Sequence, residues 1–315
     1  MIQKQDLPQI IARLFQLREK GSCRFDFLQD RLFSELCTFR IGGRIENLFV
    51  PWDVPSLCLL LGTLYPCGTP YLVLGGGSNL LPPDGVYKAP VILTSRLREL
   101  RVYGRRLYAA CGTPLNDVIL AAARSGLSGL ELLYGIPATV GGAIFMNAGA
   151  NGREISDCLE SVELYNAEAD TVLHLTAAQM RFSYRDSLLQ DKRNLTVLGA
   201  TFLLSEAEPC QVLGRVREVT HKRLASQPLQ YPSAGSAFKR PRMDTEAWRL
   251  IDLCGLRGYR CGGAQISEKH AGFIVNRGGA TAKEVRSLIN HARRSVLATT
   301  GILLIPEIEI LNNGK

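Results

Sequence analysis

Long hydrophobic runs are missing from this chain of 315 residues. A transmembrane helix needs roughly 20 consecutive apolar residues, and charge or glycine interrupts every apolar stretch before that length. Residues 1–21 mix charges with apolar side chains, so we expect an amphipathic helix there and no signal peptide. Its apolar face would consist of Ile10, Ile11, Leu14 and Leu17. These features argue against a membrane protein and favour a cytoplasmic one.

Paired cysteines are missing as well. The nine cysteines are an odd number, and no two of them form a C-x-x-C pair. A disulfide framework or a zinc site would need such pairing. We therefore interpret the cysteines as small apolar side chains of the core, and we predict no bound metal.

Acidic residues are fewer than basic ones, 29 against 37, which gives a formal charge of +8 (37 − 29). Such an excess is compatible with a nucleic acid, a membrane surface or an anionic small molecule as partner. The basic residues are dispersed in short clusters, none of which is a long run with interleaved aromatic residues, and this is typical of solvated faces. The cluster at Lys239, Arg240 and Arg242 differs because it adjoins a glycine-serine loop, which favours a binding site.

Hydrophobic residues make up 46% of the chain, enough for buried cores, and the length suggests two or three domains. Helical and strand patterns follow one another without a regular βαβ repeat, so we predict the α+β class. The expected helices cover residues 56–63, 113–125, 210–224, 245–254 and 281–299. The expected strands cover residues 47–51, 71–74, 161–165, 171–175, 195–204 and 302–311.

The first glycine-rich motif is LGGGSNLL, residues 74–81. Successive glycines directly after a strand let backbone N–H groups form a concave nest for a phosphate. The glycines are Gly75, Gly76 and Gly77, and the side chains of Ser78 and Asn79 would add donors. A tight structural turn explains the motif equally well. It is not the dinucleotide-binding fingerprint, because a leucine stands at the third glycine position.

Two further glycine-rich segments follow. Residues 135–142 would place several free amides close together, as a diphosphate requires, beside an apolar wall that could hold a flat ring. Residues 231–241 set the hydroxyl of Ser236 directly after a glycine and near Lys239 and Arg240. Taken alone, a serine at such a place is an ordinary turn residue.

Together these segments closely resemble one family, the UDP-N-acetylenolpyruvoylglucosamine reductases of bacterial cell-wall synthesis. The family's motifs occur in the family's order and extend over most of the chain. They are TFRIGG at 38–43, LGGGSNLL at 74–81, GIPATVGGAIFMNAGA at 135–150, FSYRDS at 182–187, PSAGSAFKRP at 232–241, KHAGFIVN at 269–276 and IPEIEI at 305–310.

The resemblance implies a flavoprotein of the α+β class. Residues 1–97 and 98–204 would form a two-part FAD-binding region of the vanillyl-alcohol-oxidase and p-cresol-methylhydroxylase type. Residues 205–315 would form an α+β substrate-binding domain, with the last residues returning to the first part. Covalent flavoproteins of this superfamily usually attach FAD through a histidine in the N-terminal domain. The first histidine here is His174, so we expect noncovalent FAD.

The resemblance also implies the reaction. NADPH reduces FAD, hydride passes to C3 of the enolpyruvyl group of UDP-N-acetylglucosamine enolpyruvate, and a proton is added at C2. Arg185 would stabilise the negative charge that accumulates on the substrate carboxylate, as a cation does at such a centre. Ser236 matches the family's proton donor to C2, and Glu307 would stabilise or protonate the enolic intermediate through its acid form.

Further contacts are carried over from the motifs. The cofactor contacts are Gly75, Gly76, Gly77, Ser78, Asn79, Gly135, Ile136, Pro137, Thr139, Gly141, Gly142, Asn147, Ala148 and Gly149. Tyr184, Lys239 and Arg240 are candidate substrate contacts. Two departures leave open which cation meets the phosphates: some relatives have asparagine where Arg240 stands, and many have lysine where Ser226 stands.

The interval from Arg185 to Ser236 is 51 positions (236 − 185), which is typical of the shorter, second type of the family. The longer type inserts a tyrosine-bearing loop there to close over the substrate. His270 is expected to be a structural residue or a pocket wall. We expect no nucleic-acid, membrane or obligate protein partner. Two alternatives remain: another FAD oxidoreductase of this fold with a different substrate, and a basic nucleic-acid-binding protein.

Overall fold

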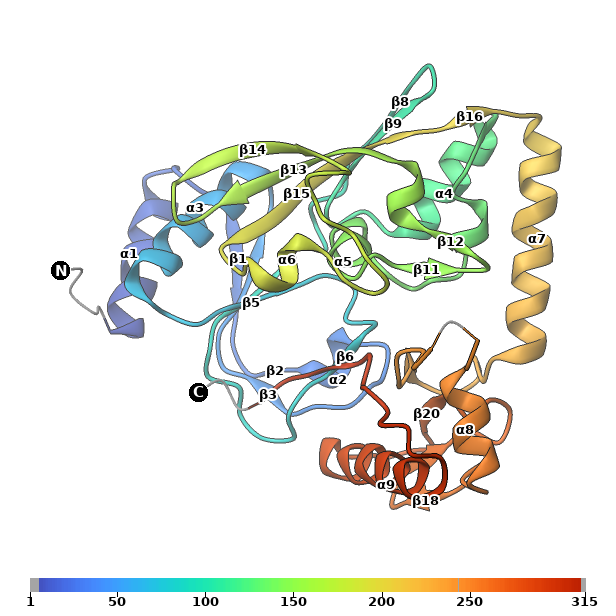
Figure 1. The fold of residues 1–315 in the computed structure, drawn as a ribbon. Coiled ribbons are helices and arrows are strands. Elements are labelled where there is room, and N and C mark those ends of the chain that lie inside the picture. Colours follow the sequence, from blue (N-terminus) through green and yellow to red (C-terminus); the bar gives the residue numbers. More distant parts are fainter. Residues whose placement is uncertain (1–5, 243, 313–315) are drawn as a thin grey trace. The chain divides into compact units, whose positions relative to one another are not determined.

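The computed structural model describes residues 6–242 and 244–312 and divides into two compact units, each assembled from separate stretches of the chain (Figure 1). Unit 1 comprises Met1–Gln29, Asn47–Gly76 and Ala89–Thr220. Unit 2 comprises Asp30–Glu46, Gly77–Lys88 and His221–Lys315. Each unit has its own cluster of buried apolar side chains. Helices and strands alternate irregularly in both units, which confirms the predicted α+β class.

The first sheet of unit 1 is mostly parallel and is buried. Its order is β1 (Phe25–Leu28), β4 (Leu48–Pro51), β7 (Val91–Leu93) and β5 (Leu72–Leu74), and only the β1–β4 pair is antiparallel. Every residue of β4 and β7 is buried, as expected for short apolar strands covered on both faces. The helices α1 (Leu7–Glu19) and α3 (Val54–Leu64) pack against each other. Ile10 and Leu14 of α1 are fully buried, which confirms the predicted apolar face.

The second sheet of unit 1 is antiparallel. Its order is β14 (Thr171–Thr176), β13 (Leu159–Asn166), β15 (Leu195–Leu203), β9 (Arg106–Ala110) and β8 (Leu100–Tyr103). The helix α5 (Val140–Phe145) packs on β15 and β9, and α4 (Leu115–Arg124) precedes it. Helix α4 begins after Pro114 and ends before Gly126, which has φ of +69°, as the sequence predicted.

The shorter elements of unit 1 connect these layers. They are η1 (Tyr65–Cys67), β10 (Leu127–Ser128), η2 (Glu131–Leu133), β11 (Gly149–Ala150), β12 (Arg153–Glu154), η3 (Ile155–Cys158), α6 (Leu188–Asp191) and β16 (Ser205–Glu206). Helix α7 (Pro209–Ser226) begins in unit 1, and its last residues belong to unit 2.

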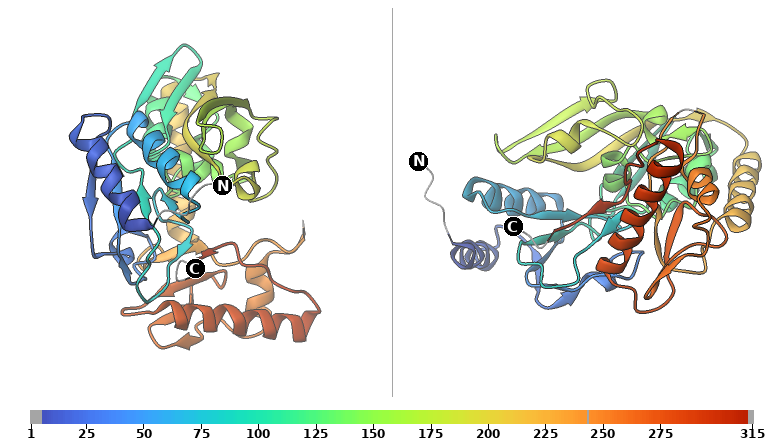
Figure 2. Two further views of the ribbon diagram at one scale, coloured as in Figure 1. Left: turned by 90° about the vertical axis from the view of Figure 1, so that its left-hand side faces the viewer. Right: turned by 60° about the horizontal axis from the view of Figure 1, so that its bottom comes forward.

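Unit 2 is built on an antiparallel sheet and one long amphipathic helix. The sheet order is β17 (Ser233–Ser236), β20 (Phe273–Asn276), β19 (Ala264–Ile266) and β18 (Arg260–Cys261). Helix α9 (Ala282–Thr300) contacts β18, β19 and α8 (Ala247–Leu253), and Figure 2 shows it running along this sheet. Thr281 and Glu284 form a reciprocal capping box at its start, and Gly301 ends it with φ of +69°.

Two early stretches of the chain belong to unit 2. They carry β2 (Arg31–Leu32), α2 (Phe33–Leu36), β3 (Arg44–Ile45) and β6 (Leu80–Leu81). The buried side chain of Asn276 donates to the carbonyl oxygens of Phe39 and Arg40, each at 3.2 Å. Asp84 accepts hydrogen bonds from the first two backbone N–H groups of α9, at 2.6 and 3.0 Å. These contacts explain why residues 30–46 and 77–88 cluster with the C-terminal part and not with unit 1.

The expected closing strand over residues 302–311 is the clearest error of the sequence prediction. Only β21 (Glu309–Ile310) is a strand, and it pairs in parallel with β6. Upstream of it, Pro306 makes one isolated bridge to Phe238. Proline has no backbone N–H group and cannot continue a ladder of hydrogen bonds, so the segment pairs at separate points instead of forming one strand.

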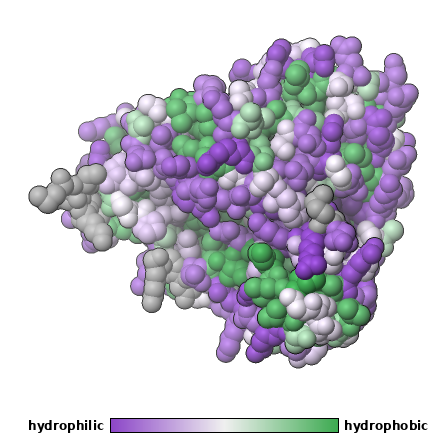
Figure 3. All heavy atoms as spheres, in the orientation of Figure 1, coloured by the Kyte–Doolittle hydropathy of each residue, from purple (hydrophilic) through white to green (hydrophobic). Residues whose placement is uncertain are grey.

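Two other predictions concern exposure. Five of the nine cysteines are buried, namely Cys23, Cys37, Cys67, Cys111 and Cys158, in agreement with their interpretation as core side chains. Three others are partly buried, and the interpretation was wrong for Cys210, which is exposed. Within the described residues, no helix is both long and apolar enough to cross a membrane. Hydrophobic residues do gather on part of the surface shown in Figure 3. In unit 2, Leu303 and Ile305 are exposed by 52% and 59%.

Candidate active site

The glycine turn after β5 makes a close backbone approach inside unit 1. A Cβ atom at Gly75 would lie 2.4 Å from Oγ1 of Thr139, and one at Gly76 would lie 3.0 Å from the carbonyl oxygen of Pro137. A Cβ at Gly75 would clash and one at Gly76 would be crowded, so the two glycines allow the turn to contact the second glycine-rich loop. Within residues 6–242 and 244–312, nothing accepts a hydrogen bond from the backbone N–H groups of Gly75 and Gly76.

The second loop, residues 135–142, is bonded more fully than expected. The backbone N–H groups of Gly135, Val140 and Gly141 donate to Asn116 Oδ1, Thr113 O and Cys111 O at 2.8 to 2.9 Å. Those of Ile136 and Gly142 donate to Leu133 O and Thr139 Oγ1. The prediction of several free amides was therefore wrong for most of this loop, because its N–H groups hold it against α4 and the end of β9.

Two amides of this loop remain, and they lie where the glycine turn approaches. Among the described residues, none accepts a hydrogen bond from the N–H groups of Ala138 and Thr139. The backbone nitrogen of Thr139 would be 3.5 Å from a Cβ at Gly76. Four backbone donors therefore lie where the two loops approach each other, at a place that a Cβ at Gly75 or Gly76 would crowd. Such a nest suits the negatively charged oxygens of a diphosphate, so these residues fit the diphosphate of FAD.

In unit 2, the end of the same motif is tied to the C-terminal segment. Gly77 has φ of +57°, and a Cβ there would lie 2.4 Å from Leu36 O. The side-chain amide of Asn79 donates to Glu307 O at 2.9 Å, and Asn79 O accepts from Glu309 N at 3.0 Å. Asn79 was expected to offer its amide to a phosphate, and here that amide holds the segment that carries Glu307.

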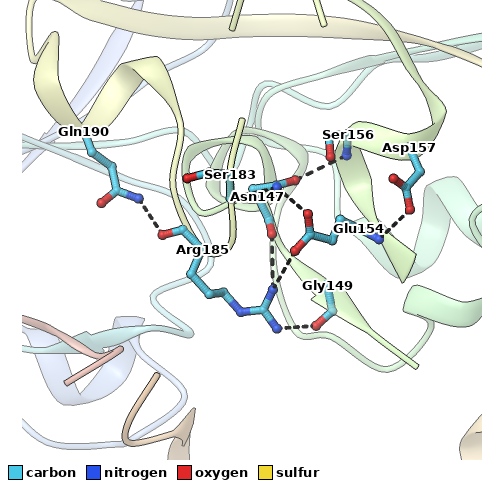
Figure 4. Close-up of polar contacts among 8 residues, drawn as sticks. All are labelled: Asn147, Gly149, Glu154, Ser156, Asp157, Ser183, Arg185 and Gln190. Atoms are coloured by element: carbon cyan, nitrogen blue, oxygen red, sulfur yellow. Dashed lines mark hydrogen bonds and ion pairs between the residues drawn. The ribbon is translucent and has the colours of Figure 1, made fainter. Parts of the chain in front are cut away.

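The side chain of Arg185 is anchored by backbone carbonyl groups. Its Nη2 donates to Gly149 O at 2.6 Å, and its Nη1 donates to Asn147 O at 3.3 Å (Figure 4). Its Nη1 also lies 3.8 Å from Oε1 of Glu154, and only 16% of the arginine side chain is exposed. The guanidinium group is therefore held on one side by two carbonyls and a carboxylate.

The backbone around Arg185 is strained. Arg185 has φ of +55° within a turn in which Ser183 and Asp186 exchange backbone hydrogen bonds at 3.1 and 3.2 Å. The side chain of Gln190 donates to Arg185 O at 3.0 Å. A left-handed conformation at a residue other than glycine costs of order 1 kcal/mol and persists only where its surroundings impose it. The guanidinium carbon also lies 5.0 Å from the ring centre of Tyr184, which is 40% exposed.

Ser236 and Glu307 come from distant parts of the sequence, and unit 2 brings their segments together. Ser236 ends β17, where Gly235 has φ of +77° and interrupts the register with β20. The hydroxyl of Ser236 donates to Phe238 O at 3.1 Å. The backbone N–H of Glu307 donates to Ala237 O at 3.0 Å, so the glutamate lies on the neighbouring segment.

The two predicted cations of the loop have different surroundings. The backbone N–H of Lys239 donates to Ile305 O at 2.9 Å, which keeps this lysine beside the segment that carries Glu307. The Nε of Arg240 lies 3.1 Å from Oε1 of Glu246, and both side chains are more than a third exposed. Arg240, which departs from some relatives, thus has an acidic partner within unit 2.

His270 has the structural role that the sequence suggested. Its ring lies 5.6 Å from that of Trp248 and 5.1 Å from that of Phe273, and its Nδ1 accepts from Gly272 N at 3.2 Å. Burial lowers the pKa of His270 from its ordinary value. A ring packed in this way has a structural role in unit 2.

Glu154 is the residue that the sequence reasoning missed. It lies 12 positions after the second glycine-rich segment (154 − 142), and its carboxylate lies beside the Arg185 guanidinium in Figure 4. Its position in the sequence gives no sign of this, because 31 positions separate it from Arg185 (185 − 154). Only the pairing of β11 with β12, which sets Glu154 opposite Gly149, places it at the site.

Comparisons with known proteins cover nearly the whole chain. Residues 57–176 match a family described as "FAD binding domain", and residues 227–311 match "UDP-N-acetylenolpyruvoylglucosamine reductase, C-terminal domain". A UDP-N-acetylenolpyruvoylglucosamine reductase of Caldicellulosiruptor bescii is 42% identical over 299 residues, or 94% of each chain. That of Thermotoga sp. (strain RQ2) is 39% identical, over 96% of this chain and 99% of the relative.

A solved structure is similar over the same extent. The crystal structure of UDP-N-acetylenolpyruvylglucosamine reductase from Thermus caldophilus aligns with a TM-score of 0.77 at 36% sequence identity. The alignment covers 92% of this chain and all of that one. The similarity therefore extends across both units.

Proposed function

The chain belongs to the UDP-N-acetylenolpyruvoylglucosamine reductases, and from this membership we propose how its own residues carry out the family's reaction. The reaction reduces the enolpyruvyl group of UDP-N-acetylglucosamine enolpyruvate to UDP-N-acetylmuramate, with NADPH as electron donor. The protein is an FAD-dependent oxidoreductase of peptidoglycan precursor synthesis. Its fold is the expected α+β one, an FAD-binding region of the vanillyl-alcohol-oxidase type followed by a substrate domain.

We propose that the backbone N–H groups of Gly75, Gly76, Ala138 and Thr139 bind the FAD diphosphate. When bound, FAD supplies the hydride that adds to C3 of the substrate. Residues 1–173 contain no histidine that could form a covalent link, which supports noncovalent binding. The other predicted cofactor contacts remain proposals: Gly77, Ser78, Asn79, Gly135, Ile136, Pro137, Gly141, Gly142, Asn147, Ala148 and Gly149.

Arg185 is proposed to bind and polarise the substrate carboxylate. Addition of hydride at C3 places negative charge on the carboxyl end of the enolpyruvyl group, and a fixed cation lowers the energy of that state. The two carbonyls that hold its guanidinium, Asn147 O and Gly149 O, support this role because they orient the cation before substrate arrives.

Ser236 is proposed to donate the proton to C2, and Glu307 to stabilise or protonate the enolic intermediate through its acid form. A serine hydroxyl is a weak acid, so it donates only to a strongly basic carbanion or enolate, with a cation such as Lys239 nearby. The observation that carries this proposal is the bond from Glu307 N to Ala237 O. It joins the segment that follows Ser236 to the one that carries the carboxyl group.

The wider assignments are also proposals. Residues 1–97 and 98–204 would serve FAD and residues 205–315 the UDP-sugar, with Tyr184, Lys239 and Arg240 as substrate contacts. We propose the cytoplasm as the site of action because NADPH and nucleotide sugars are cytoplasmic metabolites. The small-molecule substrate would need no nucleic acid, membrane or obligate protein partner.

An anaerobic stopped-flow experiment tests the assignment of Ser236. The flavin absorbance should bleach with NADPH and return with UDP-N-acetylglucosamine enolpyruvate. Ser236→Ala should leave the bleaching nearly unchanged and slow the return by about 100-fold or more, because general acid catalysis contributes on that scale. Ser233→Ala, at the other end of β17, is the matched control and should change neither step. Equal loss of both steps in Ser236→Ala would refute the proton-donor role, and bleaching without any return in the unmodified protein would point to another substrate.

A further inference from the structure

We propose that Glu154 is a positioning residue for Arg185, and this inference rests on the function proposed above for that arginine. Glu154 is the last residue of β12 and the N-cap residue of η3. Its Oε2 accepts from Asn147 Nδ2 at 2.7 Å, and its Oε1 lies 3.8 Å from Arg185 Nη1 (Figure 4). One carboxylate thus connects the arginine to the residue whose carbonyl also holds it.

The second member of this arrangement is Asn147, which is fully buried and has φ of +42°. Its side-chain amide donates to Glu154 and to Ser183 O at 2.9 Å, and its Oδ1 accepts from Ser156 N at 3.4 Å. Its backbone carbonyl accepts from Arg185 Nη1. Loss of Glu154 would remove one of these three contacts, the shortest one, and with it the carboxylate beside the guanidinium, so the Asn147 carbonyl that orients the guanidinium would be held less firmly.

Glu154 adds an attraction between opposite charges, which the two carbonyl groups do not provide. Carbonyl oxygens orient individual N–H groups, whereas a carboxylate attracts the whole cation and keeps it on one side. The two side chains are exposed by 32% and 16%, so solvent screens this attraction only in part. The arginine is thereby kept in one orientation before its anionic ligand binds. Its side-chain entropy is lost on folding, so ordering the side chain adds nothing to the activation barrier.

A purely structural role for Glu154 is the competing explanation. Its side chain accepts from the backbone N–H of Asp157, and Asp157 accepts from Glu154 N at 3.0 Å, as a reciprocal capping box of η3. Asp157 contributes the other half of the cap, its Oδ2 lies 3.8 Å from Arg153 Nε, and in Figure 4 it lies on the far side of Glu154 from the Arg185 guanidinium. Asp157→Ala removes the bond that Glu154 N donates and keeps the Glu154 carboxylate beside Arg185, which makes it the matched control for the Asp157 half of the cap.

The test compares both half-reactions in the FAD-loaded variants by anaerobic stopped flow. Glu154→Ala should slow the substrate-dependent return of flavin absorbance by about tenfold to a hundredfold, the scale of a mispositioned catalytic group. Reduction by NADPH should change by less than about twofold, since Arg185 is proposed to act on the substrate alone. Glu154→Gln keeps an oxygen acceptor for Asn147 and should recover part of the loss. Asp157→Ala should change neither rate.

A double-mutant cycle separates this inference from the proposed function. Arg185→Lys should slow the second half-reaction, and adding Glu154→Ala to it should cost no more than about threefold further, because the two residues act as one unit. Full additivity, equal slowing of both half-reactions by Glu154→Ala, or an equal effect of Asp157→Ala would overturn the positioning role. Loss of rate in Arg185→Lys without any in Glu154→Ala overturns this inference alone. No effect of Arg185→Lys overturns the function proposed for the arginine, and the inference with it.

Discussion

Removal of the Glu131 carboxylate should release the first part of α7 from unit 1. Glu131 lies in η2, and only 7% of its side chain is exposed. It accepts from Gly129 N at 2.6 Å, from Arg215 Nε at 2.8 Å and from Ser128 Oγ at 2.9 Å. Burial raises the pKa of Glu131, but these donors outweigh it and hold the pKa below the ordinary value. The carboxylate is therefore charged and is the anchor of Arg215.

The size of the effect follows from these three contacts. A hydrogen bond contributes about 1 kcal/mol net on average, and one to a charged group contributes more, so Glu131→Ala should cost at least about 3 kcal/mol. The cost stays below the upper range for breaking a buried ion pair, because Arg215 is 38% exposed and can be rehydrated. A change of 1.4 kcal/mol is tenfold in an equilibrium constant, so the local opening of α7 should increase by about 100-fold.

Hydrogen exchange measured by mass spectrometry is the direct assay. Peptides from residues 127–133 and 209–220 should lose about 100-fold of their protection in Glu131→Ala. Peptides from β18 to β20 should not change. Glu160→Ala is the control, since Glu160 makes an equally short ion pair with Arg106 at 2.7 Å, but on the surface, and should change little. Unchanged protection in Glu131→Ala, or an equal effect of Glu160→Ala, would show that the buried pair does not anchor the helix.

Two further predictions concern the cofactor and the pH. Gly75→Ala should reduce the FAD retained after gel filtration, measured as flavin absorbance per protein, because the new Cβ would lie 2.4 Å from Thr139 Oγ1. Gly214→Ala in α7, where a Cβ meets nothing within 4 Å, should retain FAD as the unmodified protein does. For His270, burial lowers the folded-state pKa, so unit 2 should lose stability in urea as the pH falls below about 6.5. His270→Phe should weaken this pH dependence, and an unchanged slope would contradict the assignment.

Local signals predicted most of the helices well. The expected helix at 281–299 is α9 (Ala282–Thr300), because Thr281, Glu284 and Gly301 supply cap and stop signals within the segment itself. The expected helix at 113–125 is α4, bounded by Pro114 and Gly126. The closing strand failed for a different reason. Whether residues 302–311 form a ladder depends on partners far away in the sequence, and Pro306 interrupts the pairing that those partners offer.

The candidate site was predictable in part. The glycine motifs indicated where the backbone comes close to an anion, and the resemblance to the family selected Arg185, Ser236 and Glu307 from many similar residues. Which backbone N–H groups are free to bind an anion was not predictable. Those of Gly135, Val140 and Gly141 donate to Asn116, Thr113 and Cys111, in that order. These acceptors lie about 20 or more positions upstream, outside any local pattern.

The sequence by itself determined the class of fold, the positions of the capped helices and the family to which the chain belongs. These properties depend on composition, on periodicity and on motifs that are contiguous in the chain. The tertiary structure alone decided that residues 30–46 and 77–88 join unit 2 and that Glu154 lies beside Arg185. Such contacts arise from hydrogen bonds and packing between distant segments, as in the bond from Asn276 to Phe39 across 237 positions. These contacts stabilise the protein only after folding has brought the distant segments together.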